Sequence, residues 1–362
     1  MDPGTSQLAA LHPANLHFGL PMATAETARL SNPLEAWRVV MSTCNEPAGA
    51  SDVVSRWLVL PRAFVQQMTL SPAGIAGLLA VRAPGFNAWL FLRSALGFVL
   101  AHAGNNLVND IFDESMGADT ADYPRALYAP HPVLSGMATR RTLVIAFLVL
   151  NLLDLAILVT LTAFRGWPVV VFAVLGLVGS VGYAAPVLRF KKRGLGEPVV
   201  FLVWGPLMVG GTYFAATGHL PWQVLAASIP YSILCTTVLF GKHIDKLEWD
   251  APLGIGTLPV LLGERVARAV TLGLMVAFYV TVVVLIPLGA LPWTSLIALL
   301  ALWRFRKSWP YLRRPRPTKR PENFPVWPLW YAAVTFVHTR RAGALLVLGL
   351  LAGAFLGFVP GR

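Results

Sequence analysis

The chain has 362 residues, of which 56% are hydrophobic and only 13% are charged, and its net charge is +12. A soluble domain carries about 25% charged residues, so this composition excludes an ordinary soluble protein and favours one that crosses a membrane several times. The basic residues lie in short clusters between apolar runs, without the register of a recognition helix, which argues against a nucleic-acid partner.

The first 56 residues are too polar to span a bilayer. They contain no basic start followed by an apolar core and a cleavage site, so we expect no signal peptide. We predict a cytoplasmic or interfacial extension over residues 1–56, in which residues 35–43 form a helix on the membrane surface.

Apolar runs repeat from residue 63 onward, each close to the roughly 20 residues that a membrane-crossing helix requires. The predicted spans are residues 63–82, 88–108, 142–163, 167–187, 198–217, 221–241, 267–287, 289–303 and 342–360. The stretch 326–337 is apolar but short and bounded by prolines, so we place it at the interface. The sequence thus predicts an all-α polytopic membrane protein of about nine helices: two four-helix halves within a core over 57–303, a basic cytoplasmic or interfacial loop over 304–341, and a final helix within 342–362.

Positive charge is concentrated in alternate loops, after the second, fourth and sixth spans and in the segment 304–341. The opposite loops carry little beyond Arg82 and Arg165. Because basic residues accumulate on the cytoplasmic side, these charged loops and the N-terminus are predicted to face the cytoplasm. We expect an integral protein of a bacterial cytoplasmic membrane, with its site on the cytoplasmic side.

Acidic residues gather at two corresponding places in the chain. Those after the second span are Asp110, Asp113, Glu114, Asp119 and Asp122, and those after the sixth span are Asp245, Glu248 and Asp250. Each cluster follows the second span of a four-span half, which indicates an internal duplication whose corresponding loops meet on one face.

The end of the second span has the polar pattern of one helix face. Asn106, Asn109, Asp110 and Asp113 recur at spacings of three and four, whereas Asn105 points elsewhere. A carboxylate face at a membrane helix end is costly unless it is paired or metal-bound, and hard oxygen ligands without His or Cys favour Mg²⁺. Two such faces could hold about two Mg²⁺ around a diphosphate and assist cleavage of its allylic C–O bond. The alternative is a pair of solvated acidic loops.

Basic and aromatic residues offer further candidate contacts. Arg189 and Lys191 lie close to the end of the fourth span and are suited to binding diphosphate oxygens, or they are plain topology charges. Arg62, at the mouth of the first span, is either an interface anchor or a substrate contact. Aromatic side chains in the spans, such as Trp204 and Tyr213, could line a prenyl tunnel or simply pack.

With these motifs the chain resembles the UbiA superfamily of intramembrane prenyltransferases. The first motif of that family is similar to Asn109-Asp110-Ile-Phe-Asp113, and the later positions of Gly117 and Asp119 resemble the branch that prenylates 1,4-dihydroxy-2-naphthoate in menaquinone synthesis. Residues 193–197 and 201–213 are similar to that branch as well. The resemblance covers about residues 57–290 and implies nine helices around a central cavity, a lateral portal for lipid substrates, and Mg²⁺-dependent transfer.

The resemblance also implies a set of site residues. One wall of the metal and diphosphate site is expected from Asn106, Asn109, Asp110, Asp113 and Asp119, and the other from Asp245 and Asp250. The expected catalytic carboxylates are Asp110, Asp113, Asp245 and Asp250, and the expected substrate contacts are Asn106, Asn109, Arg62, Tyr183, Arg189, Lys191, Lys242, His243 and Lys246.

Two departures from the family pattern concern the second motif. Asp245 and Asp250 are five positions apart, where the family usually has four, so Glu248 is a possible substitute metal ligand for a displaced Asp245. The family often places basic residues just before the threonine at Thr257, whereas this chain has none there, and Lys242, His243 or Lys246 could supply the charge.

The resulting functional prediction is Mg²⁺-dependent transfer of an isoprenoid chain from a prenyl diphosphate to an aromatic acceptor. His243 or a carboxylate is a candidate for taking the acceptor proton. A lipid alcohol, a tetrapyrrole, or cyclisation of the donor remain alternatives, and no protein partner is predicted. A secondary transporter is the rival from another class, although its polar groups would be expected near the bilayer midplane rather than at the ends of spans.

Overall fold

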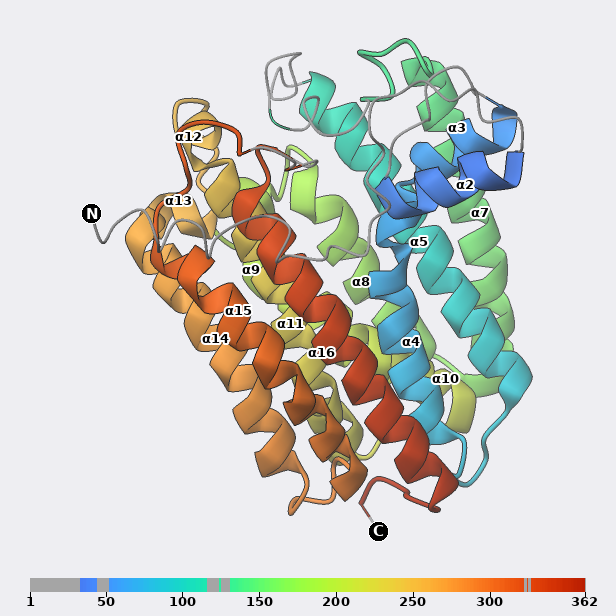
Figure 1. Cartoon of the computed structure of the whole chain (residues 1–362). Coiled ribbons are helices and arrows are strands. Elements are labelled where there is room, and N and C mark those ends of the chain that lie inside the picture. The colour runs from blue at the N-terminus through green and yellow to red at the C-terminus, as the bar shows by residue number, and fades with distance from the viewer. Residues whose placement is uncertain are drawn as a thin grey trace, which may run out of the picture.

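The computed structural model describes residues 33–43, 52–115, 124, 131–321, 324 and 327–361. Within these residues the chain is helical and contains no β-strand. The long helices run side by side as one bundle, and the short helices α2 and α3 lie across one end of it (Figure 1). The predicted all-α fold is confirmed.

The helices of the first half follow a short N-terminal pair. These elements are α2 (Pro33–Thr43), α3 (Val53–Val59), the 3₁₀ turn η2 (Ala63–Gln66), α4 (Gln67–Ala80), α5 (Ala88–Ser115), α7 (Arg140–Arg165) and α8 (Pro168–Ala184). The predicted helix at 35–43 is therefore present as α2, and its position at the membrane surface stays a prediction.

The second half begins with a broken span and ends with the last helix. Its elements are the 3₁₀ turn η3 (Phe190–Lys192), α9 (Gly196–Leu202), the π-helical η4 (Val203–Leu207), α10 (Met208–Thr217), α11 (Trp222–Asp245), α12 (Leu247–Asp250), α13 (Leu258–Leu262), α14 (Glu264–Leu285), the 3₁₀ helix η5 (Trp293–Ala301), α15 (Leu302–Arg313) and α16 (Trp330–Phe355). Each of the predicted spans coincides with helical structure.

Five segments of the described chain are long and apolar enough to cross a membrane: α7, the run from α9 to α10, α11, α14 and α16. The helix α8 is equally apolar but shorter. On α7, only 6% of the most apolar window is buried, so leucines such as Leu148 and Leu152 point outward. Apolar side chains in that position require a lipid environment, and the chain is an integral membrane protein.

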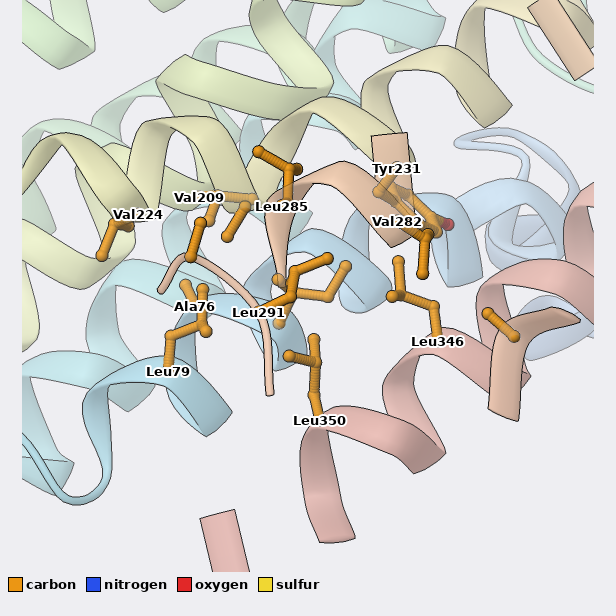
Figure 2. Packing of buried hydrophobic residues seen from close by; sticks show 14 of the residues in the cluster. Ala76, Leu79, Val209, Val224, Tyr231, Val282, Leu285, Leu291, Leu346 and Leu350 are labelled. Atoms are coloured by element: carbon orange, nitrogen blue, oxygen red, sulfur yellow. The ribbon is translucent and has the colours of Figure 1, made fainter. Parts of the chain in front are cut away.

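The main core joins the two halves to the last helix. Figure 2 shows side chains from α4, α10, α11, α14 and α16 meeting in one cluster, with Leu79, Val209, Tyr231, Val282 and Leu346 among them. The helix α16 also approaches η5 through small residues: a Cβ atom on Gly349 would lie 2.7 Å from the Cα of Ser295. Close backbone contact through glycine is a usual way for membrane helices to pack.

The last helix begins earlier than the hydropathy of the sequence predicts. It starts at Trp330 rather than near residue 342, so the predicted start of the last helix is wrong, whereas the interfacial position of the stretch 326–337 stays a prediction. The first turn packs Trp330 and Tyr331 against Phe240 of α11 and Tyr311 of α15, and this burial extends the helix. The predicted loop at 304–341 likewise begins inside α15.

The π-helical segment η4 is a local break in the fifth span. It contains Gly205 and Pro206, and proline cannot donate the regular helical hydrogen bond. A Cβ atom on Gly205 would lie 2.9 Å from the Cβ of Ser232, so the glycine lets η4 press against α11. Single-turn π segments often mark functional sites, and this one places Trp204 opposite α5.

Candidate functional site

The end of α5 carries the first polar wall. Asp110 is fully buried and forms an ion pair with the guanidinium of Arg62, which precedes α4. Asn106 donates from its amide to the carbonyl of Pro61 at 2.9 Å. Both bonds join the same two segments, so the end of α5 is fixed against the start of the first span.

Asn109, the neighbour of Asp110 in the sequence, supplies a further polar oxygen at this end of α5. Its Oδ1 is buried and has no hydrogen-bond partner within the part of the chain that the structure describes. A buried amide oxygen without a partner is costly, and such an oxygen next to a carboxylate is a suitable ligand for a hard cation. Asp113 lies in the last turns of α5, and its side chain lies outside the described residues, as does Asp119.

The second acidic segment follows α11 and contains a buried pair of opposite charges. Lys246 Nζ lies 3.9 Å from Asp250 Oδ1, and both side chains are almost fully buried. Asp250 ends the short helix α12. The loop after it turns back so that the N–H of Ile255 donates to the carbonyl of Asp250 at 2.9 Å, and this loop contains the buried Thr257. Asp250 is therefore the buried carboxylate of this segment that faces a cation rather than backbone.

Asp245 has a different environment, because both of its carboxylate oxygens accept hydrogen bonds from the backbone of α16. The N–H of Tyr331 donates to Oδ1 at 2.9 Å, and the N–H of Ala332 donates to Oδ2 at 2.8 Å. The first N–H groups of a helix lack partners within the helix, and a carboxylate there satisfies them. Asp245 thus holds the N-terminus of the last helix.

Glu248 lies at the surface of the protein. Its side chain is 75% exposed and pairs with Arg316 at 3.3 Å. The same arginine donates to the backbone carbonyl of Asp245 at 2.9 Å, so it ties the second acidic segment to the chain that precedes α16. This geometry gives Glu248 a surface ion pair, and it offers no buried oxygen for a metal.

Two buried side chains, Glu197 and His243, and the half-buried Tyr183 form a chain of hydrogen bonds between α8, α9 and α11. Glu197 Oε1 lies 2.7 Å from His243 Nδ1, and His243 Nε2 lies 3.2 Å from the hydroxyl of Tyr183. Both ring nitrogens of His243 are therefore occupied by protein groups. Glu197 was missed by the sequence reasoning, although an acid opening an apolar span is itself a signal.

The basic turn after α8 lies beside the loop after Asp250. An isolated parallel bridge pairs Arg193 with Gly256, where a Cβ atom would lie only 2.9 Å from the carbonyl of Lys192. Within this turn Arg189 is exposed and Lys191 is buried. Lys242 is half-buried on the last turn of α11. The turn and the second acidic segment are thus brought together from distant parts of the sequence.

The donor set agrees in kind with Mg²⁺. Asp110, Asn109 and Asp250 offer hard oxygens, and the basic residues around them suit a phosphorylated ligand. Among residues 33–43, 52–115, 131–321 and 327–361, which the structure describes, no group of three or more His, Cys, Asp or Glu side chains converges to hold a metal.

Known proteins similar to this chain share one family. Residues 69–334 match the UbiA prenyltransferase family. The chain is 27% identical over 218 residues to the 2-carboxy-1,4-naphthoquinone phytyltransferase of Synechocystis sp., a match that covers 59% of this chain and 66% of that protein. It is 26% identical over 232 residues to the 1,4-dihydroxy-2-naphthoate octaprenyltransferase of Haemophilus influenzae, covering 60% of this chain and 72% of that protein.

Solved structures share the fold at low sequence identity. A UbiA homolog from Archaeoglobus fulgidus bound to GPP and Mg²⁺ has a TM-score of 0.55 at 14% identity, covering 80% of this chain and 99% of that one. A digeranylgeranylglyceryl phosphate synthase has a TM-score of 0.57 at 16% identity, covering 84% and 99%. The family match extends over most of the chain and includes the helices that carry both acidic segments. This chain belongs to the UbiA prenyltransferase family.

Proposed function

We propose that this protein is a Mg²⁺-dependent prenyltransferase that moves an isoprenoid chain from its diphosphate onto 1,4-dihydroxy-2-naphthoate or a similar aromatic acceptor. The observation that carries the proposal is the buried Asp110 at the end of α5, which pairs with Arg62 and follows Asn109, whose side-chain oxygen is buried as well. A site of buried oxygens and cations suits a metal-bound diphosphate. The relatives named above act on naphthoquinone or naphthoate acceptors, which supports the choice of acceptor.

In this proposal the two walls hold the diphosphate from opposite sides. Asp110 and Asn109 bind on the first wall, and Asp250 binds on the second, with Arg189 and Lys191 contacting phosphate oxygens. When bound, Mg²⁺ supplies charge neutralisation for the departing diphosphate. The electron pair of the C–O bond leaves with the diphosphate, the allylic carbon bonds to a carbon of the acceptor ring, and the proton of that ring carbon passes to the released diphosphate.

The chain from Glu197 through His243 to Tyr183 has a positioning role in this scheme. Because both nitrogens of His243 are engaged, the ring holds Tyr183 rather than accepting a proton from a substrate. In this scheme Tyr183, held by His243, contacts the substrate at the end of the bundle where the basic turn lies. We also propose that this end faces the cytoplasm, in agreement with the positive charge of its loops.

The test uses the full-length protein purified in nanodiscs, radiolabelled geranylgeranyl diphosphate and a panel of acceptors, with Mg²⁺ or with EDTA. Asp110→Asn is compared with Asp154→Asn, which neutralises a carboxylate on α7 away from the site. We expect transfer to dihydroxynaphthoate that requires Mg²⁺, falls at least about 100-fold in Asp110→Asn and persists in Asp154→Asn. Transfer to a lipid alcohol alone would replace the acceptor, and a folded protein that transports a solute without transferring any donor would overturn the proposal.

A further inference from the structure

One ionisable side chain on the site-facing side of α5 has no part in the diphosphate site. His102 precedes Asp110 by eight residues and shares the helix face of Asn106 and Asn109. At the rise of an α-helix it lies about 12 Å deeper along the axis than Asp110. His102 therefore lies within the membrane, below the place where we put the diphosphate.

A hydrogen bond fixes the ring of His102 against the first span. Thr69 on α4 is fully buried, and its hydroxyl lies 2.6 Å from His102 Nδ1. Two further bonds join α5 to the same stretch of chain: Asp110 pairs with Arg62, and Asn106 donates to the carbonyl of Pro61. The depth and orientation of the imidazole are thus set by the same contact that positions the first polar wall.

The other side of the imidazole faces an aromatic ring from the second half of the protein. Trp204, in the π-helical segment η4, meets His102 edge-on with ring centroids 5.3 Å apart and planes at 89°. Three elements thus converge at this level: α4, α5 and η4. An aromatic side wall with a polar ring beside it is suited to a flat, polar ligand.

Polar atoms at this place lack protein partners. No residue that the structure describes hydrogen-bonds to His102 Nε2, whose ring is only half-buried. The indole N–H of Trp204 and both amide atoms of Gln66 are buried and have no partner among the described residues. Gln66 lies between Arg62 and Thr69 on the segment that faces α5. Buried groups of this kind require an explanation, and a ligand that brings oxygen atoms provides one.

We infer that His102, positioned by Thr69, binds an oxygen substituent of the aromatic acceptor, with the ring of that acceptor beside Trp204. The inference rests on the proposed function and narrows its acceptor class to aromatic rings that carry at least two oxygen substituents. One hydroxyl meets His102 Nε2, and a second oxygen accepts from the indole N–H of Trp204. For the reaction the ring carbon of the acceptor must approach the allylic carbon to about 3–3.5 Å, so the bound ring extends from His102 toward the diphosphate.

The test uses matched substitutions to distinguish the contributions of the two ring nitrogens of His102. The amide of His102→Gln reaches toward the position of Nε2, whereas that of His102→Asn reaches toward Nδ1. Thr69→Val removes the hydroxyl at constant size, and Thr69→Ser retains it. His219→Gln, near Tyr213 at the other end of the bundle, is the control.

We expect His102→Asn and Thr69→Val to raise the acceptor KM about tenfold, the effect of one lost hydrogen bond, with donor KM within about twofold. His102→Gln and Thr69→Ser should stay within about threefold of the wild type, and His219→Gln should match it. Direct binding of 1-hydroxy-2-naphthoate is measured in parallel by equilibrium dialysis, and the thermal unfolding midpoint reports folding.

The outcomes distinguish this inference from the proposed function. Normal acceptor KM and normal probe binding in both His102→Asn and Thr69→Val would overturn the inference while transfer stands. If the protein binds 1-hydroxy-2-naphthoate only when His102 is present, but transfers no prenyl group, the inference is supported and the proposed prenyltransferase function is overturned. Equal increases in donor and acceptor KM with a lowered unfolding midpoint would reduce the His102–Thr69 bond to a packing contact and contradict the inference.

Discussion

Arg62 and Arg189 adopt the same left-handed backbone conformation, with φ angles of 55° and 50°. They are the non-glycine residues with positive φ among those that the structure describes. Each immediately precedes a 3₁₀ turn, η2 or η3, that leads into the first span of a half. A side chain other than glycine in this conformation costs about 1–2 kcal/mol, so the repeat of an arginine at both places supports the predicted internal duplication.

The two arginines should nevertheless respond differently to substitution. Arg62→Ala removes the partner of the buried Asp110, and breaking a buried ion pair costs about 3–5 kcal/mol. Arg189 is exposed, so Arg189→Ala should change stability by less than about 0.5 kcal/mol while raising the KM for prenyl diphosphate. Thermal unfolding in nanodiscs and steady-state kinetics check both. Equal unfolding midpoints for the two variants would contradict the role given to the Arg62–Asp110 pair.

Asp245 should matter for folding more than for metal binding. Asp245→Ala removes both acceptors from the N-terminus of α16, and loss of such a cap costs about 0.5–2 kcal/mol. The expected result is a lowered unfolding midpoint, with an unchanged Mg²⁺ concentration for half-maximal activity. Glu248→Gln serves as the surface control and should leave both quantities unchanged, since exposed ion pairs contribute about 0–1 kcal/mol. A tenfold higher Mg²⁺ concentration for half-maximal activity in either variant would indicate that the substituted residue binds the metal.

Glu197 should act through His243. Glu197→Gln keeps a hydrogen-bonding group near Nδ1, whereas Glu197→Ala leaves the imidazole without its support. Because small displacements of catalytic groups cost up to about 100-fold in rate, we expect Glu197→Ala to lower kcat/KM by about 10- to 100-fold and Glu197→Gln by less. Steady-state kinetics with varied prenyl diphosphate measure this difference. Identical kinetics for both variants would remove Glu197 from the positioning chain.

The close contact between η4 and α11 can be tested by adding a methyl group at Gly205. In Gly205→Ala the new methyl group meets the side chain of Ser232, and overpacking of this kind costs about 1–3 kcal/mol. The double variant Gly205→Ala/Ser232→Gly opens the space again and should regain most of the lost stability. The thermal unfolding midpoints of the two variants give the comparison. A single variant as stable as the wild type would show that η4 does not press on α11.

Helix positions could be predicted because a bilayer demands long apolar runs, and these are visible without any tertiary information. The start of α16 could not be predicted in this way. Arg340 and Arg341 interrupt its hydropathy, and the prolines before it imitate the end of a span. Contacts with Phe240 and Tyr311, distant in sequence, set its beginning at Trp330.

The site was predictable to the level of residue type. Helical spacing placed Asn109 and Asp110 on one face, and Asp110 is indeed buried there. The spacing of residues along the chain does not indicate which carboxylate accepts hydrogen bonds from backbone N–H groups. It therefore could not distinguish the role of Asp245 from that of Asp250. The pairing of Glu197 with His243 spans 46 positions and depends on how α9 packs against α11. The metal and substrate roles of all these residues stay predictions.

The attachment of Asp245 to α16 has a consequence for the biogenesis of the protein. The carboxylate is synthesised 86 positions before the amide of Tyr331 that it binds, so it emerges from the ribosome long before its partner. Until the last helix has entered the bilayer, that buried charge has no backbone to hold, and the neighbouring acidic segment has no anchor. A nascent chain stopped short of α16 would therefore contain Asp245 without the two backbone amides that hold its carboxyl group in the folded protein.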